Sequence, residues 1–290
     1  MTGPSGPATA ETLYRSVRDR FAEAGLATPD LDASLLIDYA AGLTALDRLR
    51  DPACPVSDAA VVETEHCVKR RLAGEPAHRI IGAREFYGLA LDLNPSTLVP
   101  RPDTETLVDL VLPAVRDCVA RTGACSVLDL GTGTGAIALA ILAAEPDATA
   151  TATDISAEAL QAALSNAHRN ELSNRFDAVR SDWFAEIAGQ YDVIVSNPPY
   201  IRSAEITGLD AEVREHDPRI ALDGGGDGLT AYRAIAAGAI DRLKTNGVVG
   251  IEIGHDQNAD VTKLFEEEGF RKIAEMQDFS GHDRAILLMK

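Results

Sequence analysis

Apolar residues in the first part of the chain recur at steps of three and four, the spacing of one buried helix face. These positions are Leu13, Val17, Phe21, Leu35, Leu36 and Tyr39. Thr28 followed by Pro29 is typical of an N-cap and a first helical position, and Val61–Leu72 is a further amphipathic stretch. The pattern predicts a small all-helical unit over residues 1–79.

Residues 80–103 follow a different pattern, in which apolar and polar positions alternate around Gly82, Gly88 and Pro95. Alternation with a period of two is typical of strands, and glycine and proline mark turns. The pattern predicts a short hairpin that connects the helical unit to residues 104–290.

From residue 104 onward, short apolar runs alternate with longer segments of helical periodicity. The predicted strands are residues 126–130, 148–153, 178–180, 191–196, 248–253 and 285–289. The predicted helices are residues 104–119, 136–144, 157–170, 229–243 and 261–268. This alternation predicts an α/β domain, a mostly parallel sheet with helices on both faces.

A glycine-rich loop lies between the first predicted strand and the helix after it. Its residues are Gly131, Thr132, Gly133, Thr134 and Gly135. Glycine permits tight turns and close approach to a ligand, and ligands of open α/β sheets bind beyond the carboxyl ends of the strands. With Ala136 the loop also fits a dinucleotide fingerprint, and Asp154 stands where its ribose carboxylate is expected. Nicotinamide dinucleotides and S-adenosylmethionine both carry that ribose, so these residues leave the choice open, and the loop alone could also be structural.

Asp182 and Trp183 follow the third predicted strand. A carboxylate can accept a hydrogen bond from an adenine amino group, and an indole can cover the base. A helix N-cap is the alternative for Asp182, and a core or lid position is the alternative for Trp183.

The stretch YDVIVSNPPY carries most information about chemistry. An apolar strand ends at Ser196, and Asn197, Pro198, Pro199 and Tyr200 follow at once. Two prolines make a stiff turn whose carbonyls lack neighbouring donors. The carbonyl oxygens of the Asn197 side chain and the Pro198 backbone can accept both hydrogens of a planar –NH₂ group, which orients its nitrogen toward a methyl donor. Tyr200 can stack on the flat group; a merely rigid loop is the alternative interpretation.

The ordered motifs resemble those of the release factor glutamine methyltransferases, the HemK/PrmC family. They are AREFYGL (83–89), LVPRPDTETLV (98–108), VLDLGTGTGAIALA (127–140), TDIS (153–156), SDWF (181–184), VSNPPYI (195–201), LDGGGDGLTAYR (222–233) and EIG (252–254). The resemblance covers nearly all of the chain from about residue 74. It implies a class I S-adenosylmethionine-dependent methyltransferase domain preceded by a small helical bundle and a hairpin connector.

The resemblance also implies a substrate and a set of site residues. The substrate would be the glutamine of the Gly-Gly-Gln loop in class 1 peptide chain release factors, with S-adenosyl-L-homocysteine as the cofactor product. The glycine loop would surround the methionine part of the cofactor, Asp154 would bind the ribose, and Trp183 would lie near adenine, where Asp182 is the residue-based candidate beside it. Asn197 would contact both cofactor and target amide, and Asn197–Tyr200 would clamp the substrate. The roles of Arg101, Glu105, Phe86 and Glu252 stay open.

Composition changes this picture little. The formal net charge of −18 disfavours a nucleic-acid partner, because an acidic surface repels phosphates. It thus speaks against adenine methylation on DNA or RNA; methylation of a ribosomal-protein glutamine and a non-catalytic cofactor-binding module are further alternatives.

Four cysteines without a C-x-x-C pair predict reduced thiols, and the histidines lack metal-ligand spacing, so we expect no metal. Without a signal-like start or a membrane-spanning run, we expect a cytoplasmic protein. Because nothing in the helical unit indicates a dimer interface, we expect a monomer.

Overall fold

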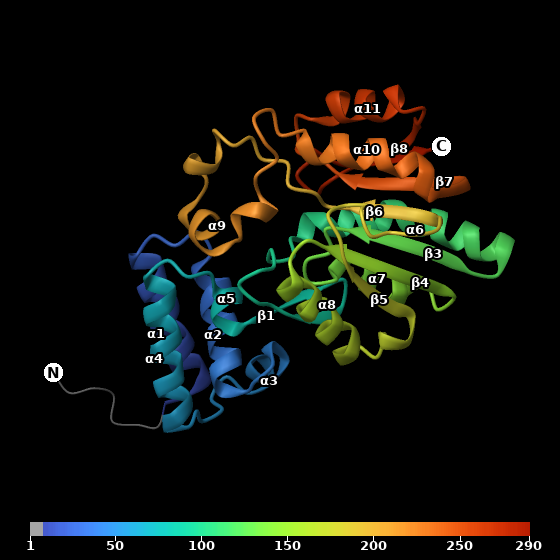
Figure 1. Ribbon diagram of the computed structural model, residues 1–290. Helices are drawn as coiled ribbons and strands as arrows, with labels where there is room; N and C mark the ends of the chain where they lie inside the picture. The colour runs from blue at the N-terminus through green and yellow to red at the C-terminus, as the bar shows by residue number, and fades with distance from the viewer. Residues whose placement is uncertain (1–7) are drawn as a thin grey trace. The chain divides into compact units, whose positions relative to one another are not determined.

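The computed structural model describes residues 8–290, which divide into two compact units on either side of the Gly82–Ala83 bond. Figure 1 shows the ribbon of both units. The first seven residues of the predicted helical unit, and with them the start of the chain, lie outside the described range. None of the helices within residues 8–290 is long and apolar enough to cross a membrane.

The first unit is helical, as predicted. Its helices are α1 (Ala10–Glu23), α2 (Pro29–Ala41), α3 (Ala45–Arg50), α4 (Asp58–Leu72) and α5 (Ala77–Ile81). Val17, Phe21 and Leu36 form part of its core, whereas Tyr39 is exposed on the outer face of α2. Helix α2 begins at Pro29 as expected, but the Thr28 hydroxyl donates to the Asp32 carboxylate instead of capping the helix.

A buried ion pair connects two helices of this unit. Arg71 on α4 donates to the Asp32 carboxylate on α2 at 2.7 Å, and both side chains are almost fully buried. Removing one partner from such a pair leaves an uncompensated charge in the core, so the pair specifies how α2 and α4 pack.

The second unit begins with the predicted hairpin. Strands β1 (Ala83–Phe86) and β2 (Leu89–Asp92) pair in antiparallel register, with Phe86 opposite Leu89. The two turn residues, Tyr87 and Gly88, have φ values of 51° and 77°. A two-residue turn with both residues in the left-handed region matches the twist of the flanking strands. Phe86 is buried in the main core of this unit, so its side chain serves packing.

A seven-stranded sheet forms the centre of the second unit, with strand order β5-β4-β3-β6-β7-β9-β8 (Figure 1). The strands are β3 (Cys125–Leu130), β4 (Ala148–Asp154), β5 (Phe176–Arg180), β6 (Tyr191–Ser196), β7 (Leu243–Glu252), β8 (Arg271–Gln277) and β9 (Asp283–Met289). The first five pair in parallel and β9 runs antiparallel to both of its neighbours. The predicted mostly parallel sheet is therefore confirmed.

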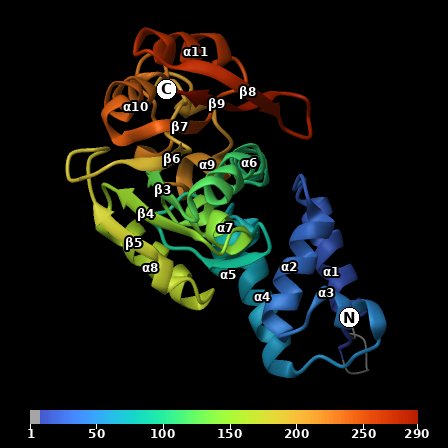
Figure 2. The ribbon, with the colours of Figure 1, turned by 90° about the vertical axis from the view of Figure 1, so that its right-hand side faces the viewer.

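Helices cover both faces of this sheet. They are α6 (Glu105–Thr122), α7 (Ala136–Ala144), α8 (Ala157–Arg169), α10 (Thr230–Arg242) and α11 (Asn258–Glu267), with the short α9 (Ala211–His216) outside the sheet layers. Figure 2 shows α6 and α7 on one face and α10 and α11 on the other. Val127 of β3 belongs to the core under α6, α7 and α8, while its neighbour Leu128 belongs to the core under α10 and α11. Alternate residues of one buried strand thus fill two cores.

Several elements of the second unit depart from the prediction; α9 was not predicted, and β7 begins at Leu243, five residues before the predicted start. Strand β8 was not expected, because no residue of its sequence RKIAEMQ is fully buried and it lies at the edge of the sheet. Strand β5 begins at Phe176, two residues before the predicted start. Apolar runs identify central strands well, but an edge strand with one exposed side lacks such a run.

Candidate active site

A cavity of about 300 Å³ opens at the carboxyl ends of β3, β4 and β6. Most of the predicted site residues line it. Those residues are Gly131, Thr132, Gly133, Thr134, Asp154, Asp182, Trp183, Asn197 and Pro199. Parallel strands end at the same edge of a sheet, so segments distant in sequence meet there.

The glycine loop has left-handed backbone at each of its glycines. The φ values are 70° at Gly131, 56° at Gly133 and 85° at Gly135. A Cβ atom at Gly131 or Gly133 would meet no atom within 4 Å, so these two positions face open space in the cavity. Gly135 differs, because its Cβ would lie 3.1 Å from Leu139 Cδ1, and it is not among the cavity-lining residues of the described chain. Its absent side chain therefore serves the packing of α7, and its place at the cofactor stays a prediction.

Asp129, the penultimate residue of β3, holds this loop from below. Its Oδ2 accepts hydrogen bonds from the Thr132 hydroxyl at 2.6 Å and from the Ala138 N–H at 3.3 Å. Burial raises the pKa of Asp129 to about 6, although both hydrogen bonds oppose the shift. Its other oxygen, Oδ1, is buried without a hydrogen-bond partner among the described residues. The carboxyl group thus supports the loop at an electrostatic cost.

Asp154 ends β4 beside the loop. One carboxylate oxygen accepts from the Gly133 N–H at 3.0 Å, and the other accepts from the Ser156 N–H at 2.9 Å. Burial raises the pKa of Asp154, while these backbone hydrogen bonds lower it. A carboxylate offers about four acceptor positions. The backbone of Ile155 lowers the pKa as well, so at least one position remains for a hydroxyl group of a ligand in the cavity.

Asp182 and Trp183 line the cavity beyond β5. Trp183 has a left-handed φ of 49°, and its carbonyl accepts from the Ser181 hydroxyl at 2.8 Å. A bulky residue rarely adopts such a φ unless its surroundings determine it. The Ser181 hydrogen bond fixes the backbone of Trp183, whose side chain lines the cavity. Asp182 does not begin a helix in the structure.

The Asn-Pro-Pro-Tyr corner follows β6 directly. Asn197 and Pro199 line the cavity, while Pro198 and Tyr200 are not among its lining residues in the described chain. A Cβ atom at Gly224 would lie 2.8 Å from Tyr200 Cα and 2.9 Å from the Pro199 carbonyl oxygen. The glycine-rich turn after residue 222 is therefore required for the backbone to pack against this corner.

Tyr200 is oriented differently from the predicted stacking residue. Its phenol oxygen lies 3.5 Å from Nη1 of Arg284 on β9, and its backbone carbonyl accepts from Gln257 Nε2 at 3.1 Å. Burial raises the pKa of Tyr200 to about 12. The ring packs against the core under α10 and α11. Tyr200 thus supports the corner through Arg284 on β9 and Gln257 just before α11. The spacing of these residues in the sequence does not indicate that they meet.

The segment ahead of α6 has defined partners that the sequence left open. Arg101 lines the cavity and pairs with Asp217 at 2.9 Å. The Glu105 carboxylate accepts the Tyr87 N–H at 2.8 Å and so holds the turn of the β1–β2 hairpin. Thr104, which the sequence analysis did not single out as a site residue, is buried, lines the cavity and accepts from Asn197 Nδ2 at 3.1 Å.

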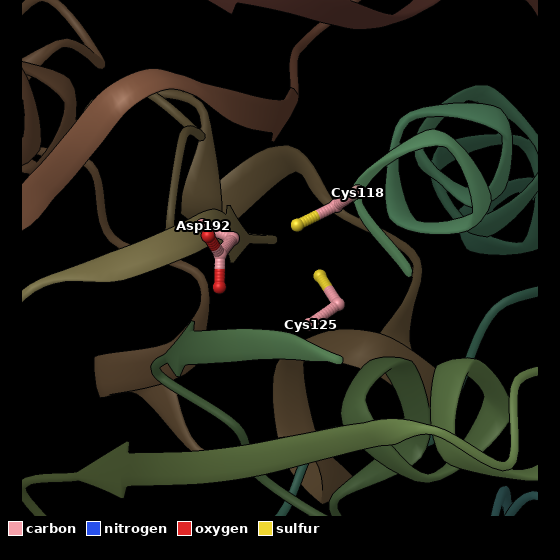
Figure 3. Close-up of side chains that lie close together, drawn as sticks. All are labelled: Cys118, Cys125 and Asp192. Atoms are coloured by element: carbon pink, nitrogen blue, oxygen red, sulfur yellow. The ribbon is translucent and has the colours of Figure 1, made fainter. Parts of the chain in front are cut away.

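A separate cluster lies at the opposite edge of the sheet. Figure 3 shows the sulfur atoms of Cys118 and Cys125 facing each other beside Asp192, and their potential ligand atoms lie within 4.8 Å of one another. Among the described residues this is a donor set close enough for a metal ion, and the sequence spacing does not reveal it.

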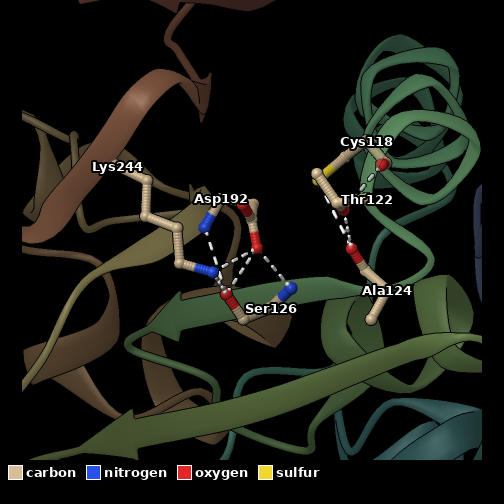
Figure 4. Close-up of polar contacts among 6 residues, drawn as sticks. All are labelled: Cys118, Thr122, Ala124, Ser126, Asp192 and Lys244. Carbon is tan, nitrogen blue, oxygen red and sulfur yellow. Dashed lines mark hydrogen bonds and ion pairs between the residues drawn. The ribbon is translucent and has the colours of Figure 1, made fainter.

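The contacts of this cluster favour neutral thiols. Asp192 Oδ2 accepts from Lys244 Nζ at 2.7 Å and from the Ser126 hydroxyl at 2.7 Å (Figure 4). The Cys118 thiol is directed to the Ala124 carbonyl at 3.6 Å. Burial, reinforced by Cys118, raises the pKa of the Cys125 thiol. The Lys244 ammonium group already neutralises the Asp192 carboxylate. A cysteine binds metal as a thiolate, and these thiols are held neutral, so the cluster is typical of core packing and not of a metal site.

Comparisons with known proteins give consistent results. Residues 12–82 match the PrmC N-terminal domain, and residues 110–215 match the Methyltransferase small domain. The chain is 49% identical over 286 residues to a release factor glutamine methyltransferase of Agrobacterium fabrum, covering 99% of each chain. It is 40% identical to a release factor glutamine methyltransferase of Caulobacter vibrioides, covering 97% of this chain and 96% of that one.

Solved structures resemble the fold at low sequence identity. The hMettl16 catalytic domain has a TM-score of 0.54 and 18% identity, covering 80% of this chain and 81% of that one. A tRNA methyltransferase of M. jannaschii has a TM-score of 0.50 and 16% identity, covering 71% of this chain and 56% of that one. These likenesses concern the methyltransferase fold alone.

Proposed function

Because the chain belongs to the release factor glutamine methyltransferase family, we propose that it methylates the glutamine of the Gly-Gly-Gln loop in class 1 peptide chain release factors. The methyl group comes from S-adenosylmethionine and is transferred to the side-chain amide nitrogen. The observation that carries the proposal is that Asn197 and Pro199 line the same cavity as Gly131, Gly133 and Asp154.

The residues around the glycine loop fit this cofactor. Gly131 and Gly133 leave open space where a side chain would intrude, and Asp154 retains an acceptor position for a ribose hydroxyl. Trp183 and Asp182 offer an aromatic face and a carboxylate for the adenine ring. When bound, S-adenosylmethionine supplies a methyl group on a positively charged sulfur. Asp129 and the loop backbone keep this cradle in shape before binding.

The Asn197 corner supplies what a weak nucleophile needs. The lone pair of an amide nitrogen is delocalised, so the group must be oriented and its developing positive charge stabilised. We assign this task to the side-chain carbonyl of Asn197, which lines the cavity. The backbone carbonyl of Pro198, a residue outside the cavity lining, stays the predicted second acceptor for the target –NH₂ group. Pro199 and Tyr200 make the corner rigid, because proline fixes φ and the Tyr200 ring packs against the core under α10 and α11.

The helical unit is our candidate for recognition of the protein substrate. Residues 12–82 match the PrmC N-terminal domain, and the unit forms its own core. The overall charge of −18 fits a protein partner better than nucleic acid. A cytoplasmic monomer that acts on folded release factors is consistent with these features.

Transfer of a labelled methyl group tests the proposal. The full chain is incubated with methyl-labelled S-adenosylmethionine and either a purified class 1 release factor, the same factor with its loop glutamine changed to alanine, or an adenine-rich duplex. Label on the unchanged factor alone is the expected result. Label on the duplex, or equal label on both forms of the factor, would overturn it.

A further inference from the structure

Glu252 and Asn197 occupy equivalent places at the ends of neighbouring strands. Ser196 of β6 is paired with Ile251 of β7 in parallel register, so Asn197 and Glu252 are the next residues on the two strands. Glu252 is only 2% exposed, and its Oε2 has no hydrogen-bond partner among the described residues. A buried carboxyl group with an unpaired oxygen beside an active site requires an explanation.

Thr104 connects these two side chains. Its hydroxyl oxygen accepts from Asn197 Nδ2 at 3.1 Å. Thr104 also lies near enough to the Glu252 carboxyl group to lower its pKa. Thr104 is 4% exposed and lies in the single 3-10 turn Pro102–Thr104 ahead of α6. Three segments far apart in the sequence therefore bring Glu252, Thr104 and Asn197 together in one short chain of polar groups that ends at the cavity.

The direction of this chain determines which end of the Asn197 amide faces the cavity. An ionised carboxylate only accepts hydrogen bonds, so the hydroxyl proton of Thr104, which the contact with Asn197 does not use, is available to Glu252. The Thr104 oxygen can then only accept, and it requires the –NH₂ end of Asn197. The carbonyl oxygen Oδ1 is consequently left for the cavity, which is the end that accepts from a target amide.

We propose that Glu252 and Thr104 are positioning residues that hold the Asn197 side chain with its carbonyl oxygen toward the methyl acceptor. The inference rests on the proposed function for the identity of that acceptor. The orientation of the Asn197 amide itself does not depend on it. If Glu252 were protonated, it could donate to Thr104, and the hydroxyl could then donate to Asn197 Oδ1. The amide would turn its –NH₂ end to the cavity and lose the acceptor.

The charges around Glu252 place this switch near neutral pH. Burial raises its pKa to about 7, while the Thr104 hydrogen bond and the Arg284 charge lower it. The groups facing Glu252 from the surrounding elements are Arg284 on β9, Arg101 and Asp103 ahead of α6, Tyr200 after β6 and Tyr232 on α10. The Arg284 guanidinium lies 2.8 Å from the Asp278 carboxylate, so its positive charge is largely compensated by that ion pair. Methylation should therefore increase as pH rises through about 7.

Kinetics of Thr104 variants test the connection. Thr104→Val removes the hydroxyl at nearly constant volume and should lower kcat about 10- to 100-fold, the effect of losing one well-placed hydrogen bond to a charged group. The Kd for S-adenosylmethionine and the KM for the release factor should change little. Thr104→Ser restores the hydroxyl and should recover most of kcat. Thr64→Val, which removes a buried hydroxyl bonded only to the Ala60 carbonyl, is the matched control.

Two kinetic outcomes would overturn the proposal. Thr104→Val could keep the kcat of the unchanged chain, or Thr104→Ser could be as impaired as Thr104→Val, which would assign the effect to packing.

Glu252→Gln provides the third arm, because an amide can both donate and accept and therefore does not fix the direction. Its kcat should be lower, and the rise in kcat around pH 7 should disappear. An unchanged pH profile in a folded Glu252→Gln protein would exclude Glu252 from the chain of hydrogen bonds.

A measurement without any substrate separates this proposal from the proposed function. The side-chain –NH₂ resonance of Asn197, identified by its loss in Asn197→Asp, should shift with a midpoint near pH 7. The shift should vanish in Thr104→Val and in Glu252→Gln. A resonance that does not respond to pH or to these substitutions would contradict the proposal even if the release factor is methylated. The expected shift without methylation of the factor would instead refute only the proposed function.

Discussion

The Asp154 carboxylate accepts the backbone N–H of Gly133 at 3.0 Å, so the end of β4 is hydrogen-bonded to the glycine loop that follows β3. A sequence comparison alone assigns these two residues separate tasks, one for the ribose and one for the methionine part of a cofactor. The hydrogen bond shows that they form a single preorganised wall of the cavity. A change at either residue should therefore affect the other.

Asp154→Ala should weaken binding of S-adenosylmethionine about 10- to 100-fold, because it removes charge-assisted hydrogen bonds to the ribose and frees the Gly133 N–H. Isothermal titration calorimetry measures this affinity directly. Asp147→Ala, an exposed carboxylate ahead of β4, is the control and should bind normally. Equal affinity in the two variants would show that Asp154 does not contact the cofactor.

Asn197→Ala should lower kcat about 10²- to 10³-fold, the effect of removing one preorganised hydrogen-bonding group from a developing charge. Single-turnover methylation of the release factor measures the loss, and the substitution of exposed Asn174 by alanine is the control. A protein that only bound the cofactor would not methylate the release factor in either form. Full activity in Asn197→Ala would remove the corner from the mechanism.

Alanine substitutions at Gly133 and Gly135 should have different effects, one mainly on cofactor binding and the other mainly on stability. Alanine is strained at both, because φ is 56° and 85°. At Gly135 the new Cβ also meets Leu139 Cδ1 at 3.1 Å and Ala163 Cβ at 3.3 Å, whereas at Gly133 it meets no atom within 4 Å. Gly135→Ala should reduce the free energy of unfolding by roughly 1 to 3 kcal/mol. Gly133→Ala should unfold closer to the unchanged chain but bind S-adenosylmethionine more weakly.

The outcome that contradicts this separation is a Gly135→Ala protein that melts like the unchanged chain. Thermal unfolding followed by circular dichroism, together with the calorimetric affinity, gives both quantities for both variants.

Asp129 should make stability depend on pH. Burial raises its pKa from 3.8 to about 6 in the folded protein, so the folded state holds its proton more tightly than the unfolded state. Its contribution to stability is fully present below about pH 4 and is lost as pH rises through about 6. Asp129→Asn, which cannot ionise, should therefore gain stability relative to the unchanged chain as pH rises across this window, by on the order of 1 to 3 kcal/mol. Urea unfolding at several pH values measures the difference, and a difference independent of pH would refute it.

The sequence revealed those parts of the molecule that depend on local pattern. The strand at residues 126–130, the glycine loop and the helix after it form one continuous stretch, and their periodicity and turn residues are sufficient. Asp154, Asp182, Trp183 and Asn197 were each identifiable because every one follows an apolar strand. Parallel strands bring such residues to one edge without further information.

What the sequence did not reveal depends on distant partners. Thr104 and Asn197 are 93 residues apart, and nothing in the surrounding motifs indicates that their side chains meet. Tyr200 was expected to face the substrate, but its phenol oxygen lies beside Arg284, 84 residues further on. Gly135 was predicted to contact the cofactor together with the rest of the glycine loop. The structure shows that a side chain at this position would instead press against Leu139 and Ala163. Pattern locates a residue on an element, but tertiary packing decides the direction of its side chain.

The identity of the methylated atom tests the central claim most directly. A class 1 release factor that has reacted with the full chain and S-adenosylmethionine is digested, and its peptides are sequenced by mass spectrometry. We predict a single added methyl group on the side-chain nitrogen of the glutamine in the Gly-Gly-Gln loop, and its absence when Asn197→Ala replaces the unchanged chain. A methyl group on any other residue, or an unmodified loop glutamine after S-adenosylmethionine has been consumed, would contradict the account.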